Sequence, residues 1–447
     1  MPPIWDASEN AENGSSRLWR AAVSDMLLHI ADIGMAIIGA AVLLRWAGLI
    51  VLSVADWLVR QLSPLPTAPP SGVPWPDVAV IVPAYNETDV IEATVRSILD
   101  GNYPDLTVII VDDGSTDSTW TIAQRLAEHP RVVALRQPQN AGKAQALNAG
   151  IASTDVDLVV TVDADTVLAP DAVRRMIAPF LQDPKLGAVA SNLKVGNRLR
   201  PIHILQSLEY ITGLHIGRRA RDLLACITTV PGAAGGWRRA AIDEVGGYSS
   251  DTLIEDTDLT IAVQRAGWKV TFQPDAVAWT EAPSTWSGLT AQRTRWMFGY
   301  LQVMYKHRGG FFRHGSLGWI GLPDLLYRQV LVFGLFILSL PYLFRVQQIF
   351  DLENVLQVIV GIFFFDLLMA IVAYVEDRER PIELLWAPVQ RVVWPLFMLA
   401  IFIRVLWRMV RYGNVPWNKL DRTATLANAS QSSSGPGVVA RRTKKSV

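Results

Sequence analysis

The chain has 447 residues, half of them hydrophobic, and its 41 basic residues balance its 41 acidic residues. A neutral net charge excludes the basic footprint of a nucleic-acid-binding protein, so no nucleic-acid partner is expected. Cys226 is the only cysteine, which excludes a disulfide framework, is typical of a reducing compartment and predicts a buried small side chain. The mean hydropathy of +0.24 reflects apolar stretches near residues 26–59 and after residue 325, which predict membrane helices.

The N-terminal segment, residues 1–62, predicts one transmembrane helix. Its apolar part, 33–55, contains only one charged residue, Arg45, and would span about 35 Å at ~1.5 Å per residue. This stretch is longer than the apolar region of a cleavable signal peptide, so we expect it to stay as an anchor. Residues 63–76 are rich in proline and predict a stiff linker to the next domain.

Residues 77–285 predict a single α/β catalytic domain. Short apolar strands are expected at 78–82, 106–111, 132–135 and 158–162, and helices at 88–99, 117–128, 143–152 and 171–181. Strict alternation of strand and helix predicts a Rossmann-like, mostly parallel sheet with helices on both faces. The β-branched, uninterrupted strands agree with burial on both sides.

Beyond residue 200 the pattern changes. The amphipathic stretch 202–226 carries Arg218, Arg219 and Arg221, and either lies along the membrane surface or packs on the sheet. Residues 286–325 predict interfacial helices, and 326–410 predict C-terminal transmembrane helices at 329–344, 355–375 and 384–407. The third contains Pro395 and Arg391, so it is expected to bend or to stay at the interface. The tail, 411–447, predicts disorder.

The membrane topology has two conflicting indications. Three C-terminal crossings would place the tail outside if the catalytic domain is cytoplasmic, whereas the basic residues around Arg404 and Arg408 and at the C-terminus argue for an inside tail. Either the third segment does not cross, or a further crossing exists.

Acidic clusters follow three of the predicted strands, and a fourth cluster precedes a helix. The clusters are Asn86-Glu87, Asp112-Asp113, Asp163-Ala164-Asp165 and Glu255-Asp256. Carboxyl ends of parallel strands open into one crevice, where such folds bind ligands. Like charges repel, so we expect a divalent ion among them: Asp163 and Asp165 suit Mg²⁺ or Mn²⁺ holding a diphosphate.

Other motifs surround these acids. Gly142-Lys143 at a helix start suits an anion but is not a P-loop, and 232–237, which ends in Gly235-Gly236-Trp237, would let a flat sugar approach the backbone. Gln292-Arg293-Thr294-Arg295-Trp296 combines guanidinium forks for phosphate with an indole for a sugar face. Each has a structural alternative: helix capping for the first acids, a solvated Lys143, a flexible turn at 232–237, and a Trp-Arg pair at lipid headgroups.

Five motifs in this order and spacing, VAVIVPAYNE, VDDGSTD, VDADT, IEDTD and QRTRW, resemble those of family 2 glycosyltransferases. The similarity is to the processive membrane synthases of poly-N-acetylglucosamine, chitin oligosaccharides, hyaluronan and cellulose, and it covers residues 73 to about 420. It implies the GT-A fold. A stretch at 417–422 resembles a further family element that folds over the active site.

The resemblance implies a role for each motif residue. Asp256 would be the catalytic base, and Asp163 and Asp165 the metal ligands. The implied nucleotide-sugar contacts are Tyr85, Glu87, Asp112, Asp113, Lys143, Asp163, Arg293 and Arg295. The implied acceptor contacts are Gly235, Gly236, Trp237, Glu255, Gln292 and Trp296.

The implied function is inverting, processive transfer of a hexose, N-acetylglucosamine in the first instance, from a UDP-sugar donor to a β-linked polysaccharide acceptor. The implied setting is the inner (plasma) membrane, where a multi-pass protein with a cytoplasmic catalytic domain contacts the lipid bilayer, aids translocation and joins accessory secretion proteins. One alternative is a non-processive enzyme acting on a polyprenyl phosphate or other lipid, against which QRTRW argues. Another is a non-catalytic nucleotide-sugar sensor in a secretion complex.

Overall fold

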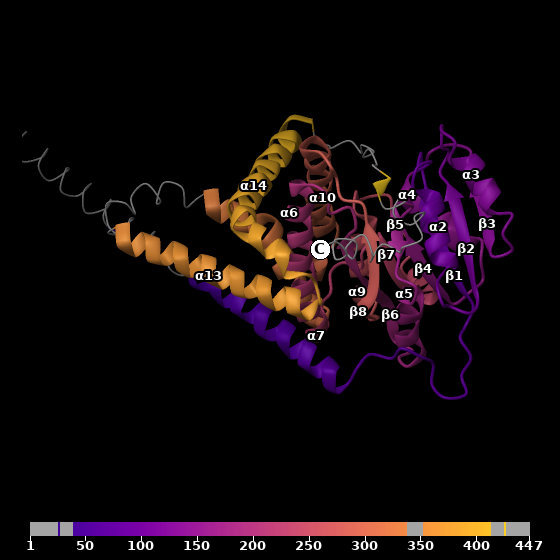
Figure 1. Cartoon of the computed structure of the whole chain (residues 1–447), viewed down its shortest axis with the longest axis horizontal. Coiled ribbons are helices and arrows are strands. Elements are labelled where there is room, and N and C mark those ends of the chain that lie inside the picture. The colour runs from indigo at the N-terminus through magenta and orange to yellow at the C-terminus, as the bar shows by residue number, and fades with distance from the viewer. Residues whose placement is uncertain (1–25, 27–38, 338–351, 413–423, 426–447) are drawn as a thin grey trace, which may run out of the picture.

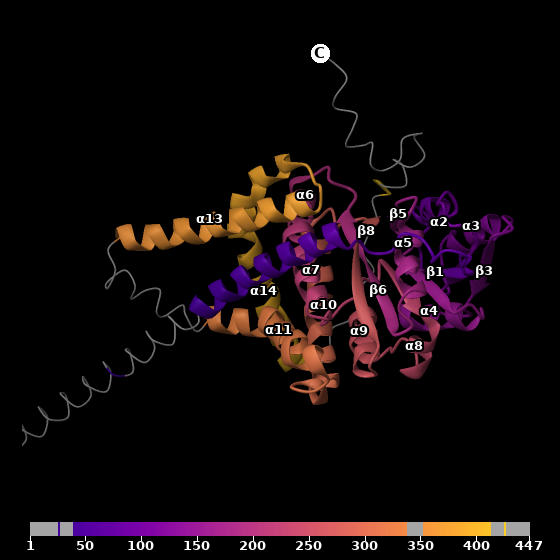
Figure 2. The same ribbon diagram turned by 90° about the horizontal axis from the view of Figure 1, so that it is seen from below.

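The computed structural model describes residues 26, 39–337, 352–412 and 424–425. The catalytic sheet and its helices form one side of the molecule, and the long apolar helices form the other (Figure 1). Helices α6, α7 and α10 lie between these two parts in both views (Figures 1 and 2). The predicted element at 417–422 lies outside the described residues.

An eight-stranded sheet in the order β3-β2-β1-β4-β7-β6-β8-β5 organises the α/β domain. The strands are β1 Val78–Ala84, β2 Leu106–Asp112, β3 Val132–Arg136, β4 Leu158–Val162, β5 Thr166–Leu168, β6 Leu186–Val195, β7 Ala234–Arg238 and β8 Lys269–Thr280. Strands β1 to β4 pair in parallel, and β6 pairs in parallel with β8. Strand β7 runs antiparallel to both its neighbours. The predicted mostly parallel α/β fold is therefore confirmed.

Both faces of the sheet are buried, which explains the uninterrupted apolar strands. In β1, Val80 and Val82 face one core cluster, and Ala79 and Ile81 face the other. The first face is covered by α2 (Ile91–Leu99), α3 (Thr119–Leu126) and α5 (Ala172–Ile177). The opposite face is covered by α4 (Lys143–Ala152), α8 (Arg239–Glu244) and α9 (Glu255–Arg265).

The stretch predicted at 202–226 forms α6 (Pro201–Glu209), a π-helical turn (Tyr210–His215) and α7 (Ile216–Leu223). Arg218, Arg219 and Arg221 are all buried, so this helix packs within the protein rather than along a free membrane surface. One side contacts β8, where the ring of His215 meets Phe272 edge-on, and the other packs on α13.

Among the residues that the structure describes, three helices are long and apolar enough to cross a membrane: Gly39–Leu62, Leu317–Ile337 and Pro381–Arg411. The second span contains α11 (Leu322–Leu326), the third overlaps α14 (Ala387–Tyr412), and α13 (Leu352–Glu376) is a further helix of 25 residues. Helix α14 continues through Pro395, and the predicted bend at this proline stays a prediction. Its Arg391 pairs with Asp366 of α13 and covers the Trp46 ring, so the charge is compensated inside the bundle.

Ion pairs join the catalytic sheet to the turn between α13 and α14. Lys194 Nζ of β6 lies 2.9 Å from Asp377 and 2.9 Å from Glu379, and Arg198 Nη1 lies 2.8 Å from Glu379 and 3.1 Å from Glu383. These contacts are mostly buried, so they fix the orientation of the sheet relative to the apolar helices.

Candidate active site

A pocket of about 570 Å³ opens at the carboxyl ends of β1, β2 and β4. Its walls come from the loops after these strands, the start of α9, α10 (Trp286–Lys306), α7 and the helix Leu317–Ile337. This is the edge at which open α/β sheets bind ligands. All four predicted acidic clusters contribute carboxylates to it: Glu87, Asp113, Asp163 and Asp165 from beyond the strand ends, and Glu255 and Asp256 from the start of α9.

One end of the pocket is built around Asp113. Its two carboxylate oxygens accept hydrogen bonds from the backbone N–H groups of Ala141 and Gly142, both at 2.8 Å. Burial raises the pKa of Asp113, and these two hydrogen bonds oppose the rise. The side chain therefore positions the loop before α4 while it lines the pocket beside Tyr85 and Glu87.

Asp112 does not line the pocket, which corrects its predicted nucleotide contact. It is the last residue of β2, fully buried, and Arg136 Nε of β3 lies 3.2 Å from its carboxylate. The next residue, Asp113, lies beyond the end of β2 and lines the pocket instead.

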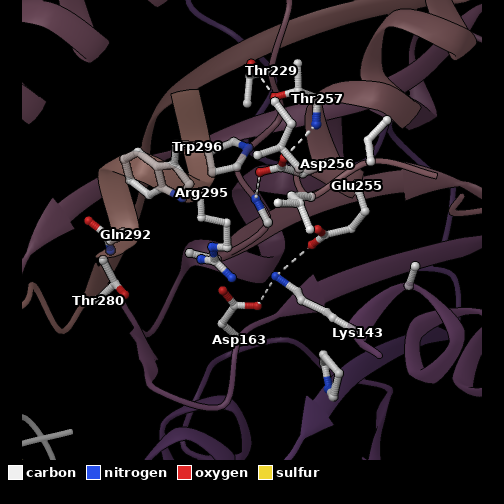
Figure 3. A pocket seen from close by; sticks show the side chains of 18 of the residues that line it. Lys143, Asp163, Thr229, Glu255, Asp256, Thr257, Thr280, Gln292, Arg295 and Trp296 are labelled. Carbon is white, nitrogen blue, oxygen red and sulfur yellow. Dashed lines mark hydrogen bonds and ion pairs between the residues drawn. The ribbon is translucent and has the colours of Figure 1, made fainter. Parts of the chain in front are cut away.

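Lys143 connects three elements at the centre of the pocket (Figure 3). Its ammonium lies 2.5 Å from Asp163, after β4, and 3.1 Å from Glu255, at the start of α9. Burial alone would lower the pKa of Lys143, but the two carboxylates raise it overall, so the side chain remains a cation. A fixed positive charge here suits a phosphate group.

Asp163 and Asp165 lie two residues apart beyond the end of β4, and both line the pocket. Burial raises the pKa of Asp163 to about 6 against the attraction of Lys143. Within the described parts of the chain, no three His, Cys, Asp or Glu side chains form a ready metal cage. The donor set fits a hard divalent ion that shares its shell with diphosphate and water oxygens, as Mg²⁺ commonly does.

Asp256 is the second residue of α9 and faces the same pocket. Its carboxylate accepts hydrogen bonds from the backbone N–H groups of Gly232, at 2.9 Å, and Thr257, at 2.6 Å. Burial and the adjacent Glu255 raise the pKa of Asp256, although Lys143 and both hydrogen bonds oppose the rise. A fixed carboxylate with a raised pKa is suited to accepting a proton.

Gly232 leaves no spare room beside these groups. A Cβ at this position would lie 2.9 Å from Lys143 Nζ and 3.2 Å from Asp256 Oδ2. We expect Gly232→Ala to displace both groups and to lower the initial rate of the reaction catalysed in this pocket by roughly ten- to a hundredfold. Gly309→Ala is the matched control, because a Cβ there meets nothing within 4 Å. Equal rates for both variants and the unchanged protein would contradict this packing argument.

Helix α10 supplies Gln292, Arg295 and Trp296 to the pocket (Figure 3). Residues spaced by three and four share one helix face, whereas Arg293 lies on another. Arg293 is buried, its Nη2 lies 2.6 Å from Glu209, and its guanidinium covers the ring of Trp296 at 4.3 Å. Arg293 does not line the pocket, so its predicted diphosphate contact is corrected. Its guanidinium instead packs on the Trp296 ring.

The predicted acceptor floor at Gly235, Gly236 and Trp237 was also wrong. These residues lie within β7, paired with β4 and β6, and Trp237 is 1% exposed. Its indole Nε1 donates a hydrogen bond to Thr161 Oγ1 at 3.3 Å. The strand was not predicted because its glycines do not give a strand pattern. The residues of this stretch that line the pocket are Gly232 and Ala233, which precede β7.

Several pocket residues were not predicted as site residues. They are Tyr210, Leu214, Arg218, Arg221, Thr228, Thr229, Glu281, Tyr300 and Arg328, among others. Most come from α7, the π-helical turn or the C-terminal helices, whose relation to the sheet is set by tertiary packing. The spacing of Arg218 and Arg221 on one helix face was the available signal.

Residues 76–299, half of the chain and most of the pocket, match the family model described as glycosyltransferase like family 2.

The chain belongs to this family.

The family 2 chain is similar to two poly-β-1,6-N-acetyl-D-glucosamine synthases. It is 31% identical to that of Staphylococcus aureus (strain MSSA476) over 254 residues, 57% of this chain and 61% of the relative. It is 27% identical to that of Staphylococcus epidermidis over 361 residues, 77% of this chain and 87% of the relative. The predicted resemblance to this type of family 2 glycosyltransferase is confirmed, although the chain spans less than two thirds of the S. aureus relative.

A solved structure supports the predicted GT-A fold of the family 2 chain. The mannosyltransferase PcManGT from Pyrobaculum calidifontis, in complex with GDP-Man and Mn²⁺, superimposes with a TM-score of 0.51. The likeness covers 81% of this chain and 99% of that chain at 22% sequence identity, so it concerns the fold.

Proposed function

We propose that this family 2 enzyme is an inverting, processive glycosyltransferase that adds N-acetylglucosamine from UDP-N-acetylglucosamine to a β-linked polysaccharide. One observation carries the proposal: Asp256, Lys143, Asp165, Arg295 and Trp296, from four separate segments, line a single pocket. The names of the relatives support the choice of sugar and product.

The donor would lie along the strand ends. Tyr85, Glu87 and Asp113 would contact the uridine, and Lys143 and Arg295 would hold the diphosphate. Asp163 and Asp165 would bind Mg²⁺ or Mn²⁺, which supplies Lewis-acid stabilisation of the leaving diphosphate when bound. Glu255 holds Lys143 from the opposite side of the pocket.

The acceptor would lie on the side of Asp256 and Trp296. A sugar hydroxyl of the acceptor attacks the anomeric carbon, the bond from that carbon to the UDP oxygen breaks, and UDP leaves with the electron pair. Asp256 takes the hydroxyl proton as the new bond forms, so the carboxylate is required at that moment. Attack from the face opposite UDP inverts the anomeric centre and gives a β linkage. Trp296 and Gln292 would orient the acceptor sugar.

The apolar helices would place this reaction at the inner (plasma) membrane with a cytoplasmic catalytic domain, as a multi-pass protein. Helix α10 supports this arrangement because it lines the pocket and packs on α14: Met297 and Phe298 form a core cluster with Ile401, Phe402 and Val405. A growing chain that leaves Trp296 would thus start beside the helices that are long enough to cross the bilayer, and accessory secretion proteins would receive it beyond.

The rate of transfer should depend on pH through Asp256. The acting form is the carboxylate, and burial with Glu255 raises the pKa of Asp256, so activity should fall as pH drops through a value above the ~4 of an ordinary aspartate. The measurement is single-turnover transfer against pH, with UDP affinity followed in parallel. A rate that stays flat down to the ordinary aspartate pKa would contradict the assignment.

Product analysis with purified full-length protein tests the proposed function as a whole. Several UDP-sugars are supplied with Mg²⁺ or Mn²⁺, UDP release is followed, and product masses are determined. The proposal predicts UDP-N-acetylglucosamine turnover and a ladder of polymer masses. A single sugar on lipid would support the non-processive alternative, and binding without UDP release would support the sensor.

A further inference from the structure

Three arginines line the end of the pocket nearest the apolar helices: Arg218 and Arg221 from α7, and Arg328 from the helix Leu317–Ile337. Helices α7, α10 and α11 lie together in this region (Figure 2). The proposed donor and acceptor contacts use none of these side chains. They form a positive group on the part of the pocket wall that α7 and the helix Leu317–Ile337 supply.

One carboxylate, that of Asp324, forms ion pairs with two of these three arginines. Arg221 Nη1 lies 2.9 Å from it and Arg328 Nε lies 3.7 Å from it. Arg45, on the helix Gly39–Leu62, also lies 2.8 Å from Asp324. Three guanidinium groups thus share one acid, so the carboxylate does not neutralise the group.

Arg218 has no such partner. It is 7% exposed, and no ion pair or hydrogen bond joins it to any residue within the described ranges. Burial and the neighbouring Arg221 lower the pKa of Arg218 to about 10, so the side chain is still a cation at neutral pH. Asp256 attracts it without forming an ion pair. The guanidinium of Arg218 therefore presents an unpaired positive charge to the pocket, where an anionic group could pair with it.

We propose that Arg218, Arg221 and Arg328 form a subsite for one phosphoryl group, separate from the diphosphate contacts at Lys143 and Arg295. Guanidinium forks match the oxygens of a phosphate in pairs. Arg328 Nη2 also donates to Thr228 Oγ1 at 3.1 Å, and this pocket-lining hydroxyl would add a neutral contact. Two of the apolar helices carry residues of the Asp324 network, so a lipid phosphate would reach the subsite from the bilayer. The inference goes beyond the proposed function and does not depend on the sugar transferred.

Two probes test the subsite on the full-length protein in neutral detergent, with UDP and Mn²⁺ in excess to fill the donor end. The probes are inorganic phosphate and mixed micelles of phosphatidic acid, with phosphatidylcholine micelles as the neutral control. Binding is followed by the shift in thermal unfolding midpoint. We expect Arg218→Gln to raise the apparent Kd about tenfold, as for loss of a charged hydrogen bond. Arg218→Lys keeps the charge but loses the two-pronged geometry of the guanidinium. Its apparent Kd should therefore lie between that of the unchanged protein and that of Arg218→Gln.

Arg200→Gln is the matched control, because it removes one positive charge from an exposed position outside the pocket. Without probe, Arg218→Gln should unfold at an equal or higher temperature, since it removes an uncompensated charge. Binding of both probes would identify a subsite open to free phosphate, and binding of phosphatidic acid alone a subsite for lipid phosphate; both support the proposal. It is overturned if neither probe binds, if excess UDP abolishes binding, or if Arg218→Gln binds like the unchanged protein.

Discussion

Asp256→Asn should lower the rate of sugar transfer by about 10²- to 10⁴-fold, the usual contribution of a positioned general base. The substitution keeps the size of the side chain and one oxygen to accept the hydrogen bond from Gly232. It removes the capacity to take the acceptor proton. UDP affinity and the unfolding midpoint should change little, because the proposed nucleotide contacts lie at the strand ends and not at Asp256. The measurement is single-turnover transfer alongside a UDP titration.

Asp251→Asn is the control for this substitution. Asp251 lies shortly before α9, its side chain is largely exposed, and it forms only a 3.4 Å surface ion pair with Lys306. Surface pairs of this kind contribute little, so the control should transfer sugar at the unchanged rate. Unaltered transfer by Asp256→Asn would remove the proposed base. A parallel loss of folding would instead assign Asp256 a structural role.

Asp165→Asn should weaken metal-dependent UDP binding by about a hundredfold, because it removes one of two carboxylates proposed to hold the ion. Asp165 is 5% exposed, and Thr280 Oγ1 lies 3.5 Å from its carboxylate, so its orientation is fixed before a ligand arrives. The expected signature is specific: the variant should bind UDP equally with Mn²⁺ or with EDTA, whereas the unchanged protein should bind far better with Mn²⁺. Calorimetric titration under both conditions provides the measurement.

Asp171→Asn serves as the matched control. Asp171 precedes the first residue of α5, does not line the pocket and pairs with Arg175. Like the unchanged protein, Asp171→Asn should bind UDP far better with Mn²⁺ than with EDTA. If the unchanged protein itself bound UDP equally with and without divalent ions, the metal would have no place in donor binding.

The sequence predicted the parts of the fold that depend on local pattern. Alternating β-branched strands and amphipathic helices located β1 to β4 and α2 to α5 because both faces of this half of the sheet are buried. The glycine-rich β7 and the strands after residue 160 were not predicted, since their pairing partners are distant in sequence. The long β8, for example, pairs with β5 and β6.

The same distinction applies to the site. Glu87, Asp113, Asp163 and Asp256 follow strand ends or begin a helix, and the pocket contains all four. Asp112 and Arg293 were misplaced because adjacent residues point in different directions, and motif membership does not specify direction. Arg218 and Arg328 reach the pocket only through the packing of α7 against the C-terminal helices, so the spacing of Arg218 and Arg221 on one helix face was not enough to place them there.

The shared core between α10 and α14 has a practical consequence for biochemical work. Met297 and Phe298 are buried by Ile401, Phe402 and Val405, while Trp296, one residue earlier in the chain, faces the pocket. A shortened protein that ends after α10 would expose this apolar surface to water and release the back of the helix that presents Trp296. Soluble fragments of the sheet domain would therefore be prone to self-association and would hold Gln292, Arg295 and Trp296 in altered positions.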